Sequence, residues 1–218
     1  MSYAPSPWTL TGAGCAVDLL RPSSEVIDLE IDVAESLARL PRFIGHVRAG
    51  PYSVAQHSVI GADLLAREDE GLAAAFLLHD AHEAYLGDVA TPVQAALAAA
   101  AGRAAAVMGA SEDVGAHVLV GLADLKAGLD RAIFEAAGLR WPAPPAWTAR
   151  VRVMDRQMLV AEARRLLPRP PRADGFPGDA APLRLGDKLT PWPWPKAAAA
   201  IRDRLARYCP RRARRRAA

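Results

Sequence analysis

Residues 72–85 read LAAAFLLHDAHEAY, and this stretch decides the interpretation of the whole chain. Its first half is apolar at nearly every position, which is typical of a helix that is buried on all sides. Gly71 precedes the stretch, and Gly87 stands where a glycine commonly ends a helix. We therefore expect residues 72–85 to form one buried helix at the centre of the fold.

The regions on both sides of this stretch are also helical in pattern. Apolar residues recur at helical spacing in six further segments, at 31–40, 54–67, 93–107, 114–137, 151–167 and 197–208. The sequence predicts an all-α bundle of five to seven helices, with a Pro-rich C-terminal arm and a short terminal helix. The expected organisation is an N-terminal loop or hairpin over 1–26, a helical domain over 27–167, and an arm, helix and Arg-rich tail over 168–218.

The composition is that of a globular protein in a reducing compartment. Apolar residues make up 51% and charged residues 23% of the 218 residues. Cys15 and Cys209 lie near opposite ends without CxxC spacing, which argues against a disulfide framework and a cysteine zinc site. The N-terminus has no secretory signal pattern, and the most apolar stretch, 72–78, is too short to span a bilayer. We expect a cytoplasmic protein that does not engage a membrane.

The formal net charge of +3 has a local origin. Residues 211–218 carry five arginines, and removing these charges from +3 leaves −2. The remaining chain therefore lacks the strongly basic balance that is typical of nucleic-acid-binding proteins. We interpret the Arg run as a solvated terminus, with contact to nucleic acid as the open alternative.

Polar side chains interrupt the second half of the apolar stretch, namely His79, Asp80, His82 and Glu83. Burying an ionised carboxylate is costly unless a cation or a hydrogen-bonding partner compensates it. Asp80 and Glu83 therefore indicate a bound divalent metal. On a continuous helix, His79, Asp80 and Glu83 would project toward one side. Imidazole and carboxylate ligands together suit Co, Mn, Fe, Ni or Zn.

Two residues from other predicted helices complete a candidate ligand set. His57 lies near the start of the helix before the central stretch, and Asp155 lies early in the helix that follows Pro145. Asp155 could instead form an ion pair with Arg152 or Arg156. His82 is interpreted as a partner in a structural hydrogen bond, with a role beside the ligands or at another metal as the alternative.

The order of these residues resembles a known signature. His57, His79–Asp80 and Asp155 follow the H…HD…D pattern of the HD superfamily of metal-dependent phosphohydrolases. Residues 78–92, LHDAHEAYLGDVATP, are similar to the HDxxE…GDxxTP stretch of the bacterial 5′-deoxynucleotidase branch. The ordered set is a stronger resemblance than the HD dipeptide, which occurs by chance in many chains.

Two upstream segments extend the resemblance, which covers residues 27–167. RFIGH at 42–46 and YSVAQHS at 52–58 look like HD hydrolases that are common in phages and bacteria. In the deoxynucleotidases a Trp follows this Arg, whereas Phe43 follows Arg42 here. The contacts that select sugar and base are therefore expected to differ.

The resemblance implies one divalent transition metal ion, held by His57, His79, Asp80 and Asp155. The metal would orient a phosphate oxygen and lower the pKa of a bound water. Glu83 would be the general acid or base, and an apolar wall around it would raise its pKa. Asp80 and Glu83 are thus the residues most directly tied to catalysis.

The resemblance also implies a substrate-binding set. Arg42 would hold the phosphate through its fork of donors, with Phe43 beside it. Asp88 would face the sugar and accept a hydrogen bond from its 3′-hydroxyl. His46 would make a second phosphate contact, or would be a loop histidine satisfied by backbone.

These inferences predict a phosphohydrolase that removes phosphate from (deoxy)nucleoside 5′-monophosphates. One alternative is a dNTP triphosphohydrolase that releases triphosphate, because the same metal and water serve both reactions. A second alternative is a non-catalytic regulator that binds nucleotides. We expect a homo-oligomer, a dimer or higher, because relatives with such a helical core often pair.

Overall fold

Helices dominate the part of the chain that the computed structural model describes, residues 6–168, 176, 180–181 and 183–209. The α-helices are α1 (Ala34–Arg39), α2 (Val54–Leu65), α3 (Glu70–Leu77), α4 (Glu83–Leu86), α5 (Thr91–Val107), α6 (Val114–Ala136), α7 (Pro145–Leu166) and α8 (Trp194–Tyr208). Short helical turns are η1 (Ser24–Val26), η2 (Leu29–Val33), η3 (Phe43–Gly45) and η4 (Gly186–Leu189). The all-α prediction is confirmed.

A small hairpin precedes the helices. Strands β1 (Trp8–Leu10) and β2 (Ala16–Asp18) pair in antiparallel register, with Thr9 opposite Val17. A hairpin is one of the two structures that the sequence allowed for this region. The predicted Arg-rich tail lies outside the described residues, as does much of the Pro-rich arm, at 169–175, 177–179 and 182.

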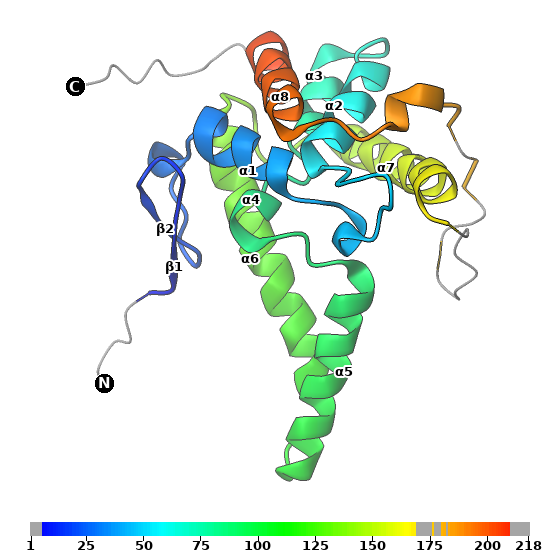
Figure 1. Cartoon of the computed structure of the whole chain (residues 1–218). Coiled ribbons are helices and arrows are strands. Elements are labelled where there is room, and N and C mark those ends of the chain that lie inside the picture. Colours follow the sequence, from blue (N-terminus) through cyan, green and yellow to red (C-terminus); the bar gives the residue numbers. More distant parts are fainter. Residues whose placement is uncertain (1–5, 169–175, 177–179, 182, 210–218) are drawn as a thin grey trace.

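The core forms where α2, α3 and α7 meet and where α8 lies across α1, α2 and α3 (Figure 1). Helices α2 and α3 approach closely at Gly61, where a β-carbon would lie 2.0 Å from the Phe76 ring. Ser53 caps α2 as its sequence indicates, because its side chain accepts the Gln56 N–H. No helix of the described chain is long and apolar enough to cross a membrane.

The C-terminal arm is tied to α2 by one side chain. Gln56, fully buried, donates through Nε2 to the carbonyls of Lys188 and Thr190, both at 2.9 Å. Its Oε1 accepts the Trp192 N–H at 2.9 Å. The three bonds hold this part of the arm against the helix that carries His57.

Helices α5 and α6 form a long hairpin that extends away from the core (Figure 1). Gly102 and Gly115 let the two backbones approach closely, since a β-carbon on Gly115 would lie 2.4 Å from the Ala98 carbonyl oxygen. Toward its C-terminal end, α6 runs back past α4 and the core, where its residues Leu129 and Ile133 are fully buried.

The prediction of one continuous helix over 72–85 is wrong. Helix α3 ends at Leu77, tight turns cover 78–82, and α4 begins at Glu83. The His79 Nδ1 lies 2.6 Å from the Phe76 carbonyl oxygen. This carbonyl is the one that the Asp80 N–H would need in a continuous α-helix, so the side chain of His79 replaces a helical hydrogen bond.

Candidate metal centre

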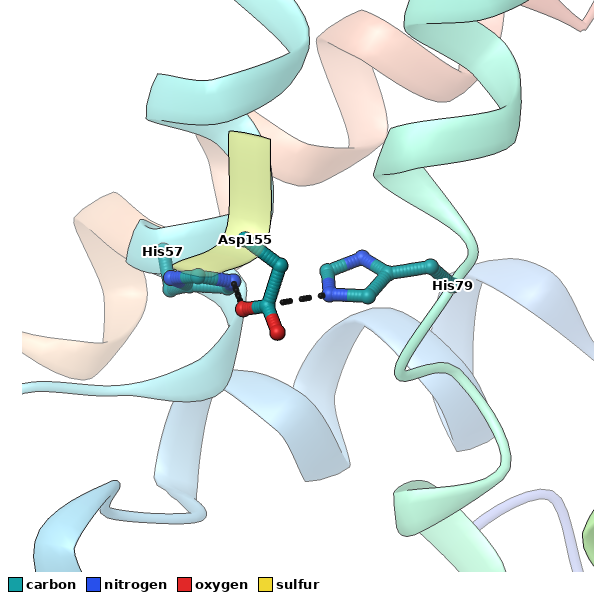
Figure 2. A group of neighbouring side chains, drawn as sticks. All are labelled: His57, His79 and Asp155. Carbon is teal, nitrogen blue, oxygen red and sulfur yellow. Dashed lines mark ion pairs between the residues drawn. The ribbon is translucent and has the colours of Figure 1, made fainter. Parts of the chain in front are cut away.

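Three side chains from separate elements converge on one point. His57 comes from α2, His79 from the turn after α3, and Asp155 from α7 (Figure 2). One ligand atom from each lies within 4.8 Å of the others. The Asp155 Oδ1 is 3.3 Å from the His57 Nε2 and 3.8 Å from the His79 Nε2. The structure thus brings together three of the four ligands predicted from the sequence as a group that could hold a metal ion.

The two histidines present the nitrogen that a metal would need. The His57 Nδ1 lies 2.7 Å from a carboxylate oxygen of Glu162, and the His79 Nδ1 faces the Phe76 carbonyl. Each Nδ1 therefore carries the proton when the ring is neutral, and each Nε2 keeps its lone pair. Both Nε2 atoms are buried and have no hydrogen-bond partner. Such orphaned acceptors fit a cation at the point where they converge.

Asp80 borders the same point. Its Oδ2 lies 3.1 Å from the His79 Nε2, 3.9 Å from the His57 Nε2 and 3.3 Å from an Arg42 nitrogen. Burial opposes ionisation of Asp80, but His79 and Arg42 outweigh it and hold the pKa of this carboxyl below its usual range. Asp80 is therefore a charged neighbour of the three-residue group and the candidate for its fourth ligand.

The site carries a surplus of negative charge. Burial lowers the pKa of His57 and of His79, but the surrounding carboxylates reverse the shift and raise both values. Asp155 acts on both rings, Glu162 on His57, and Asp80 on His79. A divalent cation at the point where Asp80 and Asp155 face the two rings would offset this negative charge.

Sequence reasoning missed Glu162, which is fully buried in α7. One of its oxygens accepts from the His57 Nδ1 and, at 2.9 Å, from the Tyr52 hydroxyl. The other accepts from the Arg42 Nε at 3.2 Å. Glu162 follows Asp155 by seven residues, which is two helical turns and therefore the same face. That spacing, within the apolar run around Val160, is the signal that could have found it.

Glu83 begins α4, and its Oε2 is buried without a hydrogen-bond partner. Burial, together with the charges of Asp80 and Asp88, raises the pKa of Glu83 to about 9. The direction is the one expected from its apolar surroundings. Asp88 follows Gly87, whose φ of 79° turns the chain back after α4. Burial also raises the pKa of Asp88, which is half-buried.

The loop between α1 and α2 brings Arg42 to the candidate metal cluster, that is, to His57, His79, Asp80 and Asp155. It closes through hydrogen bonds from the Arg42 N–H to the Tyr52 carbonyl at 2.9 Å and from the Val54 N–H to the Leu40 carbonyl at 3.0 Å. The guanidinium then meets Glu162 and Asp80. The phosphate-binding role of Arg42 stays a prediction, since its fork contacts carboxylates here.

The residues after Arg42 are in an unusual conformation. Phe43 and Ile44 have φ values of 56° and 53°, the left-handed region that a β-branched residue rarely adopts. The Phe43 ring lies 5.9 Å from the Arg42 guanidinium carbon. The His46 N–H donates to the Phe43 carbonyl at 3.0 Å, and the His46 side chain is exposed. Substrate binding by Phe43 and His46 stays a prediction.

His82 serves a different part of the fold. Its Nδ1 lies 2.9 Å from an Asp130 oxygen of α6, and both side chains are largely buried. Among the described residues, His82 is not part of the group of ligand atoms that lies within 4.8 Å. The interpretation of His82 as a partner in a structural hydrogen bond agrees with this geometry.

Comparison with known proteins finds relatives that are themselves uncharacterised. No protein-family model matches it. It is similar to an uncharacterised protein of Rhodobacter capsulatus, with 41% identity over 95 residues, 41% of this chain and 48% of that protein. It is also similar to the uncharacterised protein YfdR of Escherichia coli, with 37% identity over 86 residues, 39% of this chain and 44% of that protein. The chain thus spans about half the length of the curated relatives that it matches.

Proposed function

We propose that the chain is an HD-type metal-dependent phosphohydrolase that dephosphorylates (deoxy)nucleoside 5′-monophosphates. One observation carries the proposal, namely the convergence of two buried, unpartnered imidazole nitrogens on the Asp155 carboxylate. The resemblance to the HD signature, including the GDxxTP stretch, supplies the reaction class.

His57, His79 and Asp155, with Asp80, would hold one divalent ion, drawn from Co, Mn, Fe, Ni and Zn by the chemistry of the ligands. When bound, such an ion polarises a phosphate oxygen and lowers the pKa of a water toward neutrality. Glu162 would orient His57 by accepting a hydrogen bond from its Nδ1–H.

Glu83 would act as the general acid. Burial and the charges of Asp80 and Asp88 raise its pKa, which favours the protonated form that would donate to the oxygen leaving with the sugar. Its buried, unpartnered oxygen fits a group that gains its hydrogen-bond partner from the substrate.

Arg42 would attract the phosphate by charge, while Glu162 and Asp80 fix its position. Its guanidinium contacts the carboxylates of Asp80, Asp155 and Glu162. Asp88 would receive the sugar hydroxyl. The predicted homo-oligomer stays a prediction.

A substrate panel tests the proposal. Protein supplemented with Mn²⁺ or Co²⁺ is incubated with dNMPs, NMPs and dNTPs, and phosphate is separated from triphosphate. We expect phosphate from monophosphates, with dNMPs preferred. Triphosphate from dNTPs would establish the triphosphohydrolase alternative. Nucleotide binding without turnover by metal-loaded protein would establish the regulator.

A further inference from the structure

A cavity of about 310 Å³ lies between the N-terminal hairpin, η2, α1 and α4. None of the cluster residues His57, His79, Asp80 and Asp155 lines it. Its wall includes Ala84 and Tyr85 of α4, and the Ser36 hydroxyl of α1 donates to the Ala84 carbonyl at 3.2 Å. The volume falls within the range of small-molecule sites in proteins.

Asp32 brings an uncompensated carboxylate to this cavity. The side chain is 4% exposed. Its Oδ1 accepts the Ala13 N–H at 2.8 Å, and its Oδ2 is buried with no hydrogen-bond partner. In the described part of the chain, no ion pair reaches it. A carboxylate removed from water in this way is destabilising unless a donor, above all a cation, faces it.

The backbone around Asp32 is shaped to present it. Asp32 belongs to the π-helical turn η2, a form of helix that is rare and is often found at functional sites. The hairpin loop folds over it, with Gly12 so close that an added β-carbon would lie 3.3 Å from Ile31 and 3.7 Å from the Asp32 Oδ1. The carboxylate is thus held in place from both sides.

Tyr85 lies on the same cavity with a second unsatisfied group. It is 8% exposed, and its hydroxyl is buried without a hydrogen-bond partner. Burial and the Asp32 charge raise the pKa of Tyr85, so the phenol stays neutral and can donate or accept. Two buried polar groups without partners, on one cavity, point to a ligand that satisfies both.

Two other charged side chains, Glu35 and Arg39, line the wall and form an ion pair with each other. The Arg39 Nη2 donates to Glu35 at 2.9 Å, and Arg202 donates to the same carboxylate. The Arg39 guanidinium also lies 3.8 Å from the centre of the Trp194 ring. Among the lining residues Glu35 and Arg39 cancel, so Asp32 leaves a net charge of −1, while Arg202, which is not part of the lining, adds a positive charge beside Glu35. Next to Asp32 a phosphate or carboxylate ligand would be repelled, whereas a cation would be attracted.

We propose that this cavity binds a small organic cation, an ammonium or amidinium compound, whose N–H groups donate to the Asp32 Oδ2 and which contacts the Tyr85 hydroxyl. The carbon skeleton would lie against Leu10, Ile31 and Ala84, the apolar part of the wall. This proposal does not depend on the function proposed for the metal cluster.

Three probes of one shape and different charge test it: benzamidine, benzamide and benzoate. Each is titrated into the ¹⁵N-labelled full chain, and the Ala13 amide resonance is followed, because this N–H is bonded to Asp32. We expect a saturable shift with benzamidine, binding of benzamide weaker by about tenfold or more, and no shift with benzoate. Equal binding of all three, or no shift with any, would mean that the cavity holds only water.

Substitutions locate the binding. Asp32→Asn should weaken benzamidine binding by about tenfold or more, and Tyr85→Phe by a few fold. Asp155→Ala should leave benzamidine affinity unchanged. This result would show that benzamidine does not bind at the carboxylates of the candidate metal cluster. Unchanged affinity in Asp32→Asn would overturn the proposal. If Asp32→Asn does not fold, the charge series and Tyr85→Phe decide the matter.

Discussion

In the described part of the chain, two largely buried histidines face a carboxylate through their Nδ1 atoms and differ in their surroundings. His57 faces Glu162 at 2.7 Å, and His82 faces Asp130 at 2.9 Å, each through its Nδ1. At His57 the opposite nitrogen is buried, unpartnered and 3.3 Å from Asp155. The His82 ring lies outside the group formed by His57, His79 and Asp155. A histidine–carboxylate pair is therefore no sign of a metal by itself, and the second nitrogen of the ring is what distinguishes the two regions.

The largest expected effect is on the rate of phosphate release, and it should distinguish Glu83 from its neighbour His82. Glu83→Gln removes the proposed general acid and should lower phosphate release by about 10²–10⁴-fold. Metal uptake should stay as in the wild type, because the ligands are intact. His82→Gln, one position earlier, should keep activity within about threefold after correction for the folded fraction. Turnover assays on both variants compare the two regions, and an active Glu83→Gln protein would remove the catalytic role of Glu83.

The next largest effect is on metal affinity, and it should distinguish Glu162 from Asp130, the carboxylates that face His57 and His82. Glu162→Gln keeps the shape of the side chain but weakens its hold on His57, and metal affinity should fall by about 10–100-fold. Asp130→Asn is the matched change in the other pair and should leave metal affinity unaltered. Metal titrations of the two variants measure the difference. Equal losses in both would contradict the distinction drawn here.

The pH dependence of stability should report on the region around His57, His79 and Glu83. In the metal-free protein the pKa of Glu83 is raised to about 9 from its ordinary value of 4.5, so the fold holds a proton that the unfolded chain releases. The raised pKa values of His57 and His79 act in the same direction. Stability should therefore fall as pH rises from about 5 to 9. Denaturant unfolding of the wild type and of Glu83→Gln should show a flatter profile in the variant.

The smallest effect is expected at the structural pair. Asp130→Asn replaces a charge-assisted hydrogen bond by a neutral one and should lower the free energy of unfolding by about 1 kcal/mol. Chemical denaturation of metal-free protein measures it. A loss of metal together with this small destabilisation would show that His82 belongs to the metal centre after all.

The sequence predicts the candidate metal ligands better than the residue that orients them, Glu162. His79 and Asp80 stand out because they interrupt an apolar run, and His57 and Asp155 follow from the ordered HD pattern. Glu162 did not stand out, since the Arg164 and Arg165 that follow it make that end of α7 resemble a solvated face.

The shape of the fold was predictable only in part. The helical segments follow from apolar spacing, but the break after Leu77 coincides with a contact between the His79 ring and the Phe76 carbonyl, which no periodicity encodes. The Ala-rich segment of α5 indicates a helix equally well whether it is buried or projects. Its extension with α6 away from the core depends on long-range packing.

The most direct test of the account is the metal content of the purified protein. The chain is stripped with a chelator, incubated with excess Co²⁺ or Mn²⁺, desalted and analysed for metal per chain. The account predicts about one ion per chain in the wild type and in Asp130→Asn, and almost none in Asp155→Ala. A wild-type protein that retains no ion, or an Asp155→Ala protein that retains as much as the wild type, would contradict it.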